Sequence, residues 1–197
     1  MTKSSSGFTL IELLVVIAII GVLSSIVLSS LVQVREKADV AKAVTEVRSL
    51  QTAIELYNTD VGTPPVANCS LSACTASNDP MLNSLGARGW AGPYSPHFYD
   101  FADPWGGQYS FHRVDDAGNP DWDGDGRRDY GIRMNDDRPG TNSSDNGGPI
   151  PLSAAIAIDK ILDDGNLSTG NVRGNGASFG PNMYCSIGEL CIWFGNY

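Results

Sequence analysis

The hydrophobic pattern of the chain begins with one long apolar segment near the N-terminus. From Phe8 to Val34 nearly every residue is apolar or small, and Glu12 is the only charged residue in the segment. At about 1.5 Å of rise per residue, a helix of this length can span a bilayer. A lone carboxylate in such a helix costs about 2.5–3.5 kcal/mol on insertion, so Glu12 is expected to have a partner and a function.

After Val34 the pattern becomes that of an amphipathic helix. Charged residues alternate with apolar residues that recur every three or four positions, which predicts a helix with one buried face. The stretch Gly62-Thr63-Pro64-Pro65 predicts where the helix ends, so one helix is expected from Phe8 to about Asp60. A coiled coil is the alternative for the buried stripe, but the stripe is too short to require one. The stripe consists of Val40, Val44, Val47, Leu50, Ile54 and Tyr57.

Three strands and one short helix are predicted in the rest of the chain. Strands are predicted at residues 109–114 and 130–134, where apolar side chains alternate with others, and at residues 191–194. Residues 153–162 predict a helix, and Asp163-Asp164-Gly165-Asn166 is interpreted as a plain turn in preference to a metal site. These elements predict an α+β fold, with one long N-terminal helix packed on a small antiparallel β-sheet and a loop-rich C-terminal region.

Composition and charge refine this outline. The 22 glycines and 11 prolines among 197 residues indicate a globular part rich in loops. The predicted division is a leader at 1–7, an apolar helix half at 8–32, an amphipathic helix half at 33–61 and a globular domain at 62–197. The formal net charge of −9 gives no basic field that would attract nucleic acid, so nucleic acid is not an expected partner.

An aspartate-rich loop between the first two predicted strands is the clearest chemical site. Residues 121–129 place carboxylates at the first, third, fifth and ninth positions and a glycine at the sixth. Calcium takes six to eight oxygen ligands, and this spacing predicts a structural Ca²⁺ site. Ile132 stands where an EF-hand has its glutamate, so the loop is not an EF-hand. The alternative is a solvated acidic hairpin loop, in which the carboxylates would repel one another. The predicted ligands are Asp121, Asp123, Asp125, the Arg127 carbonyl and Asp129.

Four cysteines form two close pairs in the sequence, Cys69 with Cys74 and Cys185 with Cys191. An even number at short spacing is typical of an exported protein with disulfides. Neither pair has the CxxC spacing of a zinc site, and no histidine lies nearby. Local disulfides and bonds between the two pairs both remain open at the level of sequence.

The residues at the start of the apolar segment resemble a processing signal. The cleavage site of a secretory signal peptide follows its apolar core, whereas the small residue Gly7 precedes this one. The stretch Gly7-Phe8-Thr9-Leu10-Ile11-Glu12 is similar to the type III signal of type IV pilins and type II secretion pseudopilins. The resemblance implies cleavage between Gly7 and Phe8 by a prepilin peptidase, then methylation of the Phe8 amine. It also implies that Glu12 pairs with the N-terminus of a neighbouring subunit.

Two turn segments that carry aromatic residues extend the resemblance. The segments Gly89–Tyr94 and Asp103–Tyr109 are expected to pack their aromatic side chains on the core. They resemble the Gly-Pro-Tyr and Asp-Pro-Trp-Gly segments of the major pseudopilins of type II secretion, a family that also carries a calcium site further along the chain. The cysteines Cys185 and Cys191 resemble those of the disulfide-closed C-terminal loop of many type IV pilins.

The resemblance implies a structural subunit of a type IV pilus-like or type II secretion pseudopilus filament. The implied partners are further copies of the chain, a prepilin peptidase, an inner-membrane assembly platform and, before assembly, membrane lipid. The chain would cross the inner membrane once and then enter an extracytoplasmic or cell-surface filament. The alternative function is a monomeric, membrane-anchored extracellular binding domain, such as an adhesin or receptor. An enzyme is not predicted, since neither His97 nor His112 lies in a catalytic motif.

Overall fold

The computed structural model describes residues 7–65, 79–95, 102–113, 129–136, 150–174, 178–179, 183–185 and 188–196. The chain divides into two compact units, Met1–Ala38 and Asp39–Tyr197. The first unit contains the apolar part of the long helix. The second, called the globular unit below, contains the amphipathic part and the strands found among the described residues.

The long helix α1 extends from Leu10 to Val61, which confirms the predicted element and places its end one residue beyond the expected position. Gly62 follows it with a positive φ of 85°, and its N–H donates to the Asn58 carbonyl at 2.8 Å. This is the usual conformation of a glycine that ends a helix. The prolines at positions 64 and 65 then prevent any continuation.

The main sheet is antiparallel and has four strands in the order β1-β2-β6-β3. The strands are β1 (Gln108–Arg113), β2 (Asp129–Asp136), β6 (Leu190–Asn196) and β3 (Val172–Gly174). The first three confirm the predicted strands, although Val114 lies outside the described residues. The register aligns Phe111, Ile132, Ile192 and Val172 in one row across the sheet, and all four are buried. A second antiparallel pair joins β4 (Ser178–Phe179) and β5 (Met183–Tyr184).

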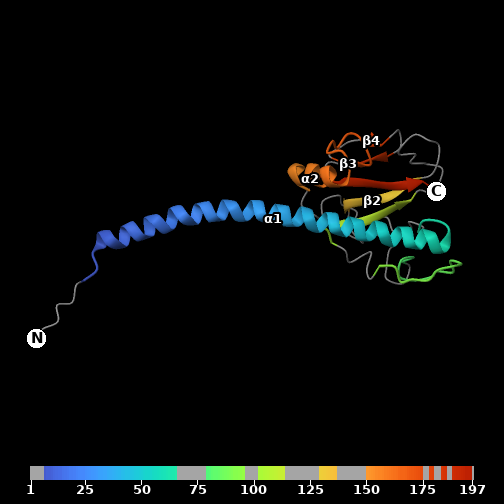
Figure 1. The fold of residues 1–197 in the computed structure, drawn as a ribbon, viewed down its shortest axis with the longest axis horizontal. Coiled ribbons are helices and arrows are strands. Elements are labelled where there is room, and N and C mark those ends of the chain that lie inside the picture. The colour runs from blue at the N-terminus through green and yellow to red at the C-terminus, as the bar shows by residue number, and fades with distance from the viewer. Residues whose placement is uncertain are drawn as a thin grey trace, which may run out of the picture. The chain divides into compact units, whose positions relative to one another are not determined.

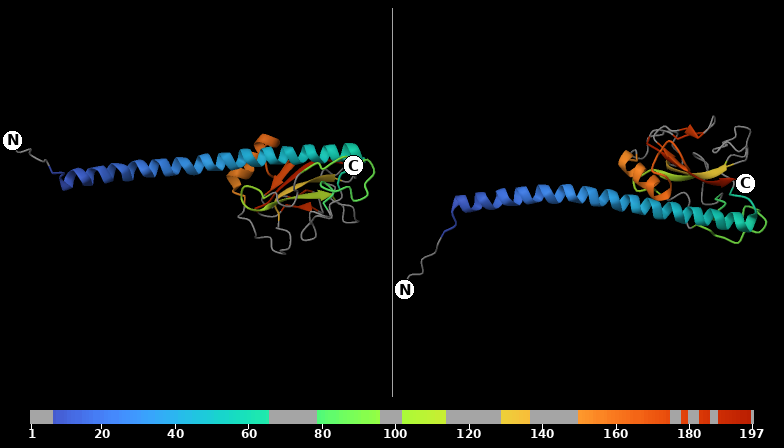
Figure 2. Two further views of the ribbon diagram at one scale, coloured as in Figure 1. Left: turned by 90° about the horizontal axis from the view of Figure 1, so that it is seen from below. Right: turned by 45° about the horizontal axis from the view of Figure 1, so that its top comes forward.

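The core of the globular unit lies between the sheet and the second part of α1 (Figures 1 and 2). The predicted stripe is buried throughout, and Ile54 is fully inaccessible to solvent. The second helix, α2 (Leu152–Leu162), begins one residue before the predicted position. Its residues Ala154, Ala155 and Ile158 join the same core. The fold class predicted from the sequence is thereby confirmed.

The two turn segments with aromatic residues also pack on this core, as expected. Trp90, Tyr94 and Trp105 contact it while remaining partly exposed. The Tyr94 ring meets the Tyr57 ring edge-on at a centroid distance of 5.4 Å, and its hydroxyl donates to Asp60 Oδ2 at 2.7 Å. These contacts fix the 79–95 segment to the end of α1.

Candidate functional site

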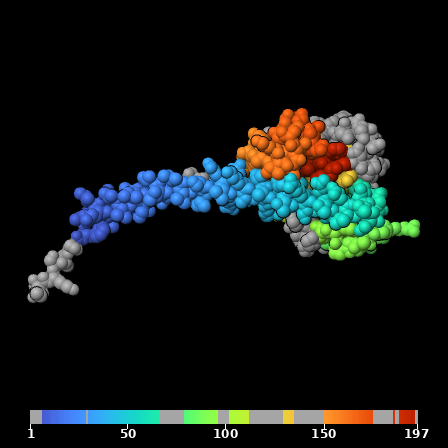
Figure 3. Space-filling view, in the orientation of Figure 1, coloured from blue at the N-terminus to red at the C-terminus, as the bar shows by residue number. Residues whose placement is uncertain are grey.

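The first candidate site is the apolar surface at the start of α1, drawn in blue in Figure 3. Its large apolar side chains are exposed from Phe8, at 78%, to Val34, at 62%. By length and composition, α1 is apolar enough to cross a membrane, and none of its most apolar stretch is buried in the structure. Water would oppose such exposure, so this surface needs lipid or protein around it.

The carboxylate of Glu12 is held by the residue that opens the helix. Thr9 accepts the first intrahelical hydrogen bond, from the Leu13 N–H at 3.3 Å, and is therefore the N-cap residue. Glu12 Oε2 accepts the Thr9 N–H at 2.8 Å and the Thr9 hydroxyl at 2.7 Å. The Glu12 N–H in turn donates to Thr9 Oγ1 at 3.3 Å. Threonine and glutamate three positions apart form a capping box, which satisfies amides that a helix start leaves unpaired.

The capping box gives Glu12 one of the interaction partners that the sequence predicts for it. Within this chain both hydrogen bonds to the Glu12 carboxylate come from Thr9. The positive end of the helix dipole favours a negative charge at this position modestly. A carboxylate at the exposed start of an apolar helix can still pair with a cation from another molecule. Gly7 and Phe8 are exposed beside it, while residues 1–6 of the predicted leader lie outside the described residues.

The predicted calcium loop falls almost entirely outside the described residues. Asp121, Asp123, Asp125 and Arg127 are among the residues not described. Asp129 is the first residue of β2, where it aligns with Asn196, and it is only 1% exposed. The loop therefore stays a prediction, with one of its five expected ligands located at the end of a core strand.

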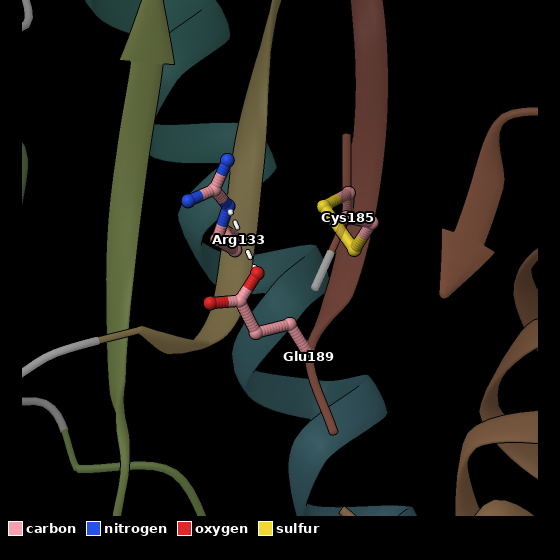
Figure 4. Close-up of a disulfide and its surroundings, with 4 residues drawn as sticks. Arg133, Cys185 and Glu189 are labelled. Carbon is pink, nitrogen blue, oxygen red and sulfur yellow. Dashed lines mark ion pairs between the residues drawn. A yellow bond between two sulfur atoms is a disulfide. The ribbon is translucent and has the colours of Figure 1, made fainter. Parts of the chain in front are cut away.

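The second cysteine pair forms a disulfide in the structure. Cys185 is bonded to Cys191, the second residue of β6, and both are fully buried (Figure 4). Beside it, Arg133 Nε of β2 lies 3.6 Å from Glu189 Oε2, an ion pair that Figure 4 also shows. Cys69 and Cys74 lie outside the described residues.

A buried polar contact ties α1 to the sheet. The Tyr109 hydroxyl of β1 donates to Glu46 Oε2 at 2.8 Å, and Glu46 Oε1 lies 3.6 Å from Lys42 Nζ. Burial raises the pKa of the Tyr109 phenol strongly, and the Glu46 carboxylate raises it further. The phenol therefore stays protonated in the folded protein and acts as a structural donor rather than an acid.

Asp103 organises the turn that leads into β1. Its Oδ1 accepts the Trp105 N–H at 2.8 Å and the Gly107 N–H at 3.1 Å, and the residue is 3% exposed. The Asp-Pro-Trp-Gly segment is thus a side-chain-capped turn, as its residues suggest. Its role here is to position β1 against α1.

Sequence reasoning overlooked two of the residues that prove to be informative. Thr9 was not singled out, although Thr-x-x-Glu before an apolar run is a readable capping signature. Asp159 falls within the predicted helix at residues 153–162 and has no predicted role, although a carboxylate within the mostly apolar stretch 154–162 is unusual. In the structure Asp159 is fully buried.

Two family models match neighbouring segments of the chain. Residues 2–28 match the family model of the prokaryotic N-terminal methylation motif, and residues 30–128 match type II secretion system (T2SS), protein G. The type II secretion system core protein G of Escherichia coli (strain K12) is 39% identical over 111 residues, which are 55% of this chain and 72% of the relative. The core protein G of Vibrio cholerae is 32% identical over 120 residues, 60% and 78% of the two chains.

A pilus protein matches a shorter part of the chain. The fimbrial protein of Pseudomonas aeruginosa is 45% identical over 53 residues, which are 27% of this chain and 34% of the relative. No solved structure matches the chain. The similarity to the core G proteins thus covers a longer part of the chain than the similarity to the fimbrial protein.

Proposed function

Since the chain belongs to the type II secretion system protein G family, we propose that it is a structural subunit of a type II secretion pseudopilus. The observation that carries this proposal is the exposed apolar surface of α1, in which Glu12 is the only charge from Phe8 to Val34. A surface of this kind fits lipid before assembly and the helices of other subunits afterwards. The function is structural, and no reaction is assigned to the chain.

The N-terminal methylation motif supports a processed precursor. In this proposal the inner membrane holds the precursor through α1, and a prepilin peptidase cleaves between Gly7 and Phe8. Methylation of the new Phe8 amine follows. An inner-membrane assembly platform then moves the subunit into an extracytoplasmic filament.

Glu12 acts in this proposal as the residue that sets the register between subunits. Its carboxylate would pair with the Phe8 ammonium of a neighbouring subunit in the water-poor filament core. A buried ion pair contributes little net stability, but leaving one charge unpaired costs about 3–5 kcal/mol. Subunits displaced along the filament would suffer that loss, so the pair favours one register.

The capping box allows the charge of Glu12 to be tested separately from its hydrogen bonds. Glu12→Gln keeps a side chain that suits a capping box but removes the charge. We expect the variant to remain in the membrane and be cleaved normally, while the amount of sheared, sedimentable filament falls at least about tenfold. Immunoblots of sheared and membrane fractions measure both quantities.

Ser25→Ala is the matched control, since the Ser25 hydroxyl lies in the same apolar segment and donates only to the Val22 carbonyl of its own helix. It removes a polar group without changing the charge and should assemble like the unaltered protein. Normal filament yield from Glu12→Gln would rule out the register role of the carboxylate.

A monomeric, membrane-anchored binding domain is the less favoured function. It would need the same apolar helix, but it would not need a carboxylate at a fixed distance from a cleaved N-terminus. The two functions differ in the sheared fraction, because only a filament subunit sediments as a polymer.

We also propose that residues 121–129 bind one structural Ca²⁺ in the globular unit. The support is the spacing of the carboxylates and the glycine in the sequence. Asp123→Asn should reduce by one the number of calcium ions bound per chain in isothermal titration calorimetry. If Asp123→Asn binds as many calcium ions per chain as the unaltered protein, the loop at residues 121–129 is not a calcium site.

A further inference from the structure

Three carboxylates meet where α2 ends. Asp159 lies in the last turns of the helix, Asp163 is its C-cap residue, and Asp164 follows. One carboxylate oxygen from each can be chosen so that all three lie within 4.8 Å of one another. The cluster lies outside residues 30–128, the part of the chain that matches the protein G family.

Asp159 is the residue that sets this cluster apart from a surface acidic patch. It is fully buried, and neither of its carboxylate oxygens has a hydrogen-bond partner of normal geometry among the described residues, although the main-chain N–H groups of Gly165 and Asp164 lie near enough to lower its pKa. Its position near the C-terminal end of α2 adds to the cost, because the helix dipole is negative there. A buried carboxylate with open oxygens normally has a cation or a proton on it.

The effect on its pKa agrees with that environment. The pKa of Asp159 is raised to about 6, first by burial and then by the Asp164 and Asp163 carboxylates, while the main-chain N–H groups of Gly165 and Asp164 oppose the rise. The cationic side chain of Arg173 acts on Asp164, whose pKa is lowered first by its hydrogen bonds to Thr169 and Asn166. Arg173 Nε itself donates to the Gly170 carbonyl at 3.1 Å.

The following loop holds the other two carboxylates in place. Asp163 Oδ2 accepts the N–H groups of Asn171 and Val172, which lead into β3. Asp164 Oδ1 accepts the Asn166 N–H at 2.7 Å, and its Oδ2 accepts the Thr169 hydroxyl at 2.7 Å.

Gly170 makes the approach of this loop to Asp163 feasible. It has a positive φ of 71°, and a Cβ atom there would collide with the Asp163 carboxylate. The loop is therefore built closely around the acidic side chains. Its surface is part of the orange region of Figure 3.

We propose that Asp159, Asp163 and Asp164 bind one calcium ion at the junction of α2 and β3. The donors are all oxygen, which favours a hard cation over zinc or copper, whose sites use nitrogen or sulfur. Calcium tolerates irregular geometry and mixed carboxylate, carbonyl and water ligands, whereas Mg²⁺ requires a near-ideal octahedron. Main-chain carbonyls that the end of α2 leaves without helical partners are a further source of oxygen ligands.

The ion would connect two elements of the globular unit. Asp159 is among the buried residues of α2, and Asp163 is hydrogen-bonded to the start of β3. A cation that bridges the two carboxylates would fix the C-terminal end of α2 to the edge strand of the sheet. Calcium would then stabilise this region independently of the loop at residues 121–129.

The test uses the full chain in detergent micelles, with calcium alone as the ligand. Because the loop at residues 121–129 is a second proposed site, every protein in the comparison carries Asp123→Asn. Isothermal titration calorimetry to about 1 mM calcium, the range of extracellular calcium modules, measures binding, and thermal denaturation measures its effect on Tm. We expect one calcium ion per chain and a Tm that rises with calcium.

Addition of Asp159→Asn should weaken this binding at least about tenfold and abolish the rise in Tm. Asp164→Asn, at an exposed position, should weaken binding in the same way and serves if Asp159→Asn fails to fold without calcium. Glu55→Gln is the control, since it removes the same charge from an exposed position on α1 and should leave binding unchanged.

Two results would overturn the proposal. One is a parent protein, with Asp159 intact, that binds no calcium. The other is calcium binding of equal strength with and without Asp159→Asn and Asp164→Asn. If Asp159→Asn raises the Tm while calcium has no effect on the parent, the three carboxylates share a proton and hold no metal.

Discussion

At the scale of single residues, several polar side chains have contacts that the sequence pattern does not reveal. The sequence predicts that Glu12 has an interaction partner. The structure shows a partner within the same chain, because the Thr9 hydroxyl donates to the Glu12 carboxylate. The proposed intermolecular pairing concerns its charge, whereas Thr9 satisfies hydrogen bonds. The two roles are compatible because a carboxylate can accept several donors at once.

The hydrogen bond from Tyr109 to Glu46 is expected to stabilise the folded protein. We expect Tyr109→Phe to lower the free energy of unfolding by about 1.5–3 kcal/mol, because the hydroxyl is buried and donates to the charged Glu46. Lys42→Ala is the control, since it removes the other partner of Glu46 at an exposed position and should cost at most about 1 kcal/mol. Equal losses in both variants, measured by thermal denaturation, would contradict this role.

The same tyrosine predicts a dependence on alkaline pH. Its pKa is raised in the folded protein, so the unfolded chain loses the phenolic proton first. The contribution of Tyr109 is fully present below about pH 10, its unfolded pKa, and is lost as the pH rises above that value. Melting temperatures from pH 9 to 11 should therefore fall less in Tyr109→Phe than in the unaltered protein. Parallel curves would exclude this linkage.

At the scale of elements, the spacing of apolar residues predicted the long helix and three of the strands correctly. The stripe from Val40 to Tyr57 recurs every three or four residues and is buried as expected. The strands β1, β2 and β6 carry apolar residues in an extended pattern and were also found. The strand β3 was missed because Val172-Arg173-Gly174 is three residues long and ends in glycine. Its place in the sheet comes from pairing with β6, which no local pattern encodes.

Substitutions on the buried and exposed faces of α1 are expected to change the stability of the protein by different amounts. Ile54→Ala should lower the free energy of unfolding by about 2–5 kcal/mol, since Ile54 is fully buried against the sheet. Leu56→Ala is the matched control, because Leu56 lies two residues away and is 54% exposed. Its expected effect is within about 0.5 kcal/mol. If thermal denaturation gives similar losses for both, this face of α1 is not the core face.

At the scale of the whole molecule, the two compact units need different surroundings. The first exposes the apolar side chains of α1, while the second buries its own core and contains the Cys185–Cys191 disulfide. The sequence shows an apolar run followed by an amphipathic pattern along one predicted helix, and the predicted boundaries at residues 32 and 61 stay a prediction. It did not predict the acidic cluster of Asp159, because the burial of that residue depends on how α2 packs and on the loop that follows it.

The central claim is that the chain is a processed filament subunit, and the intact mass of the protein in sheared filaments tests it most directly. The proposal predicts that the sedimented polymer contains this chain beginning at Phe8, with one methyl group on its amine. The claim would be contradicted by a chain that keeps residues 1–7 and is found only as a monomer in the membrane fraction.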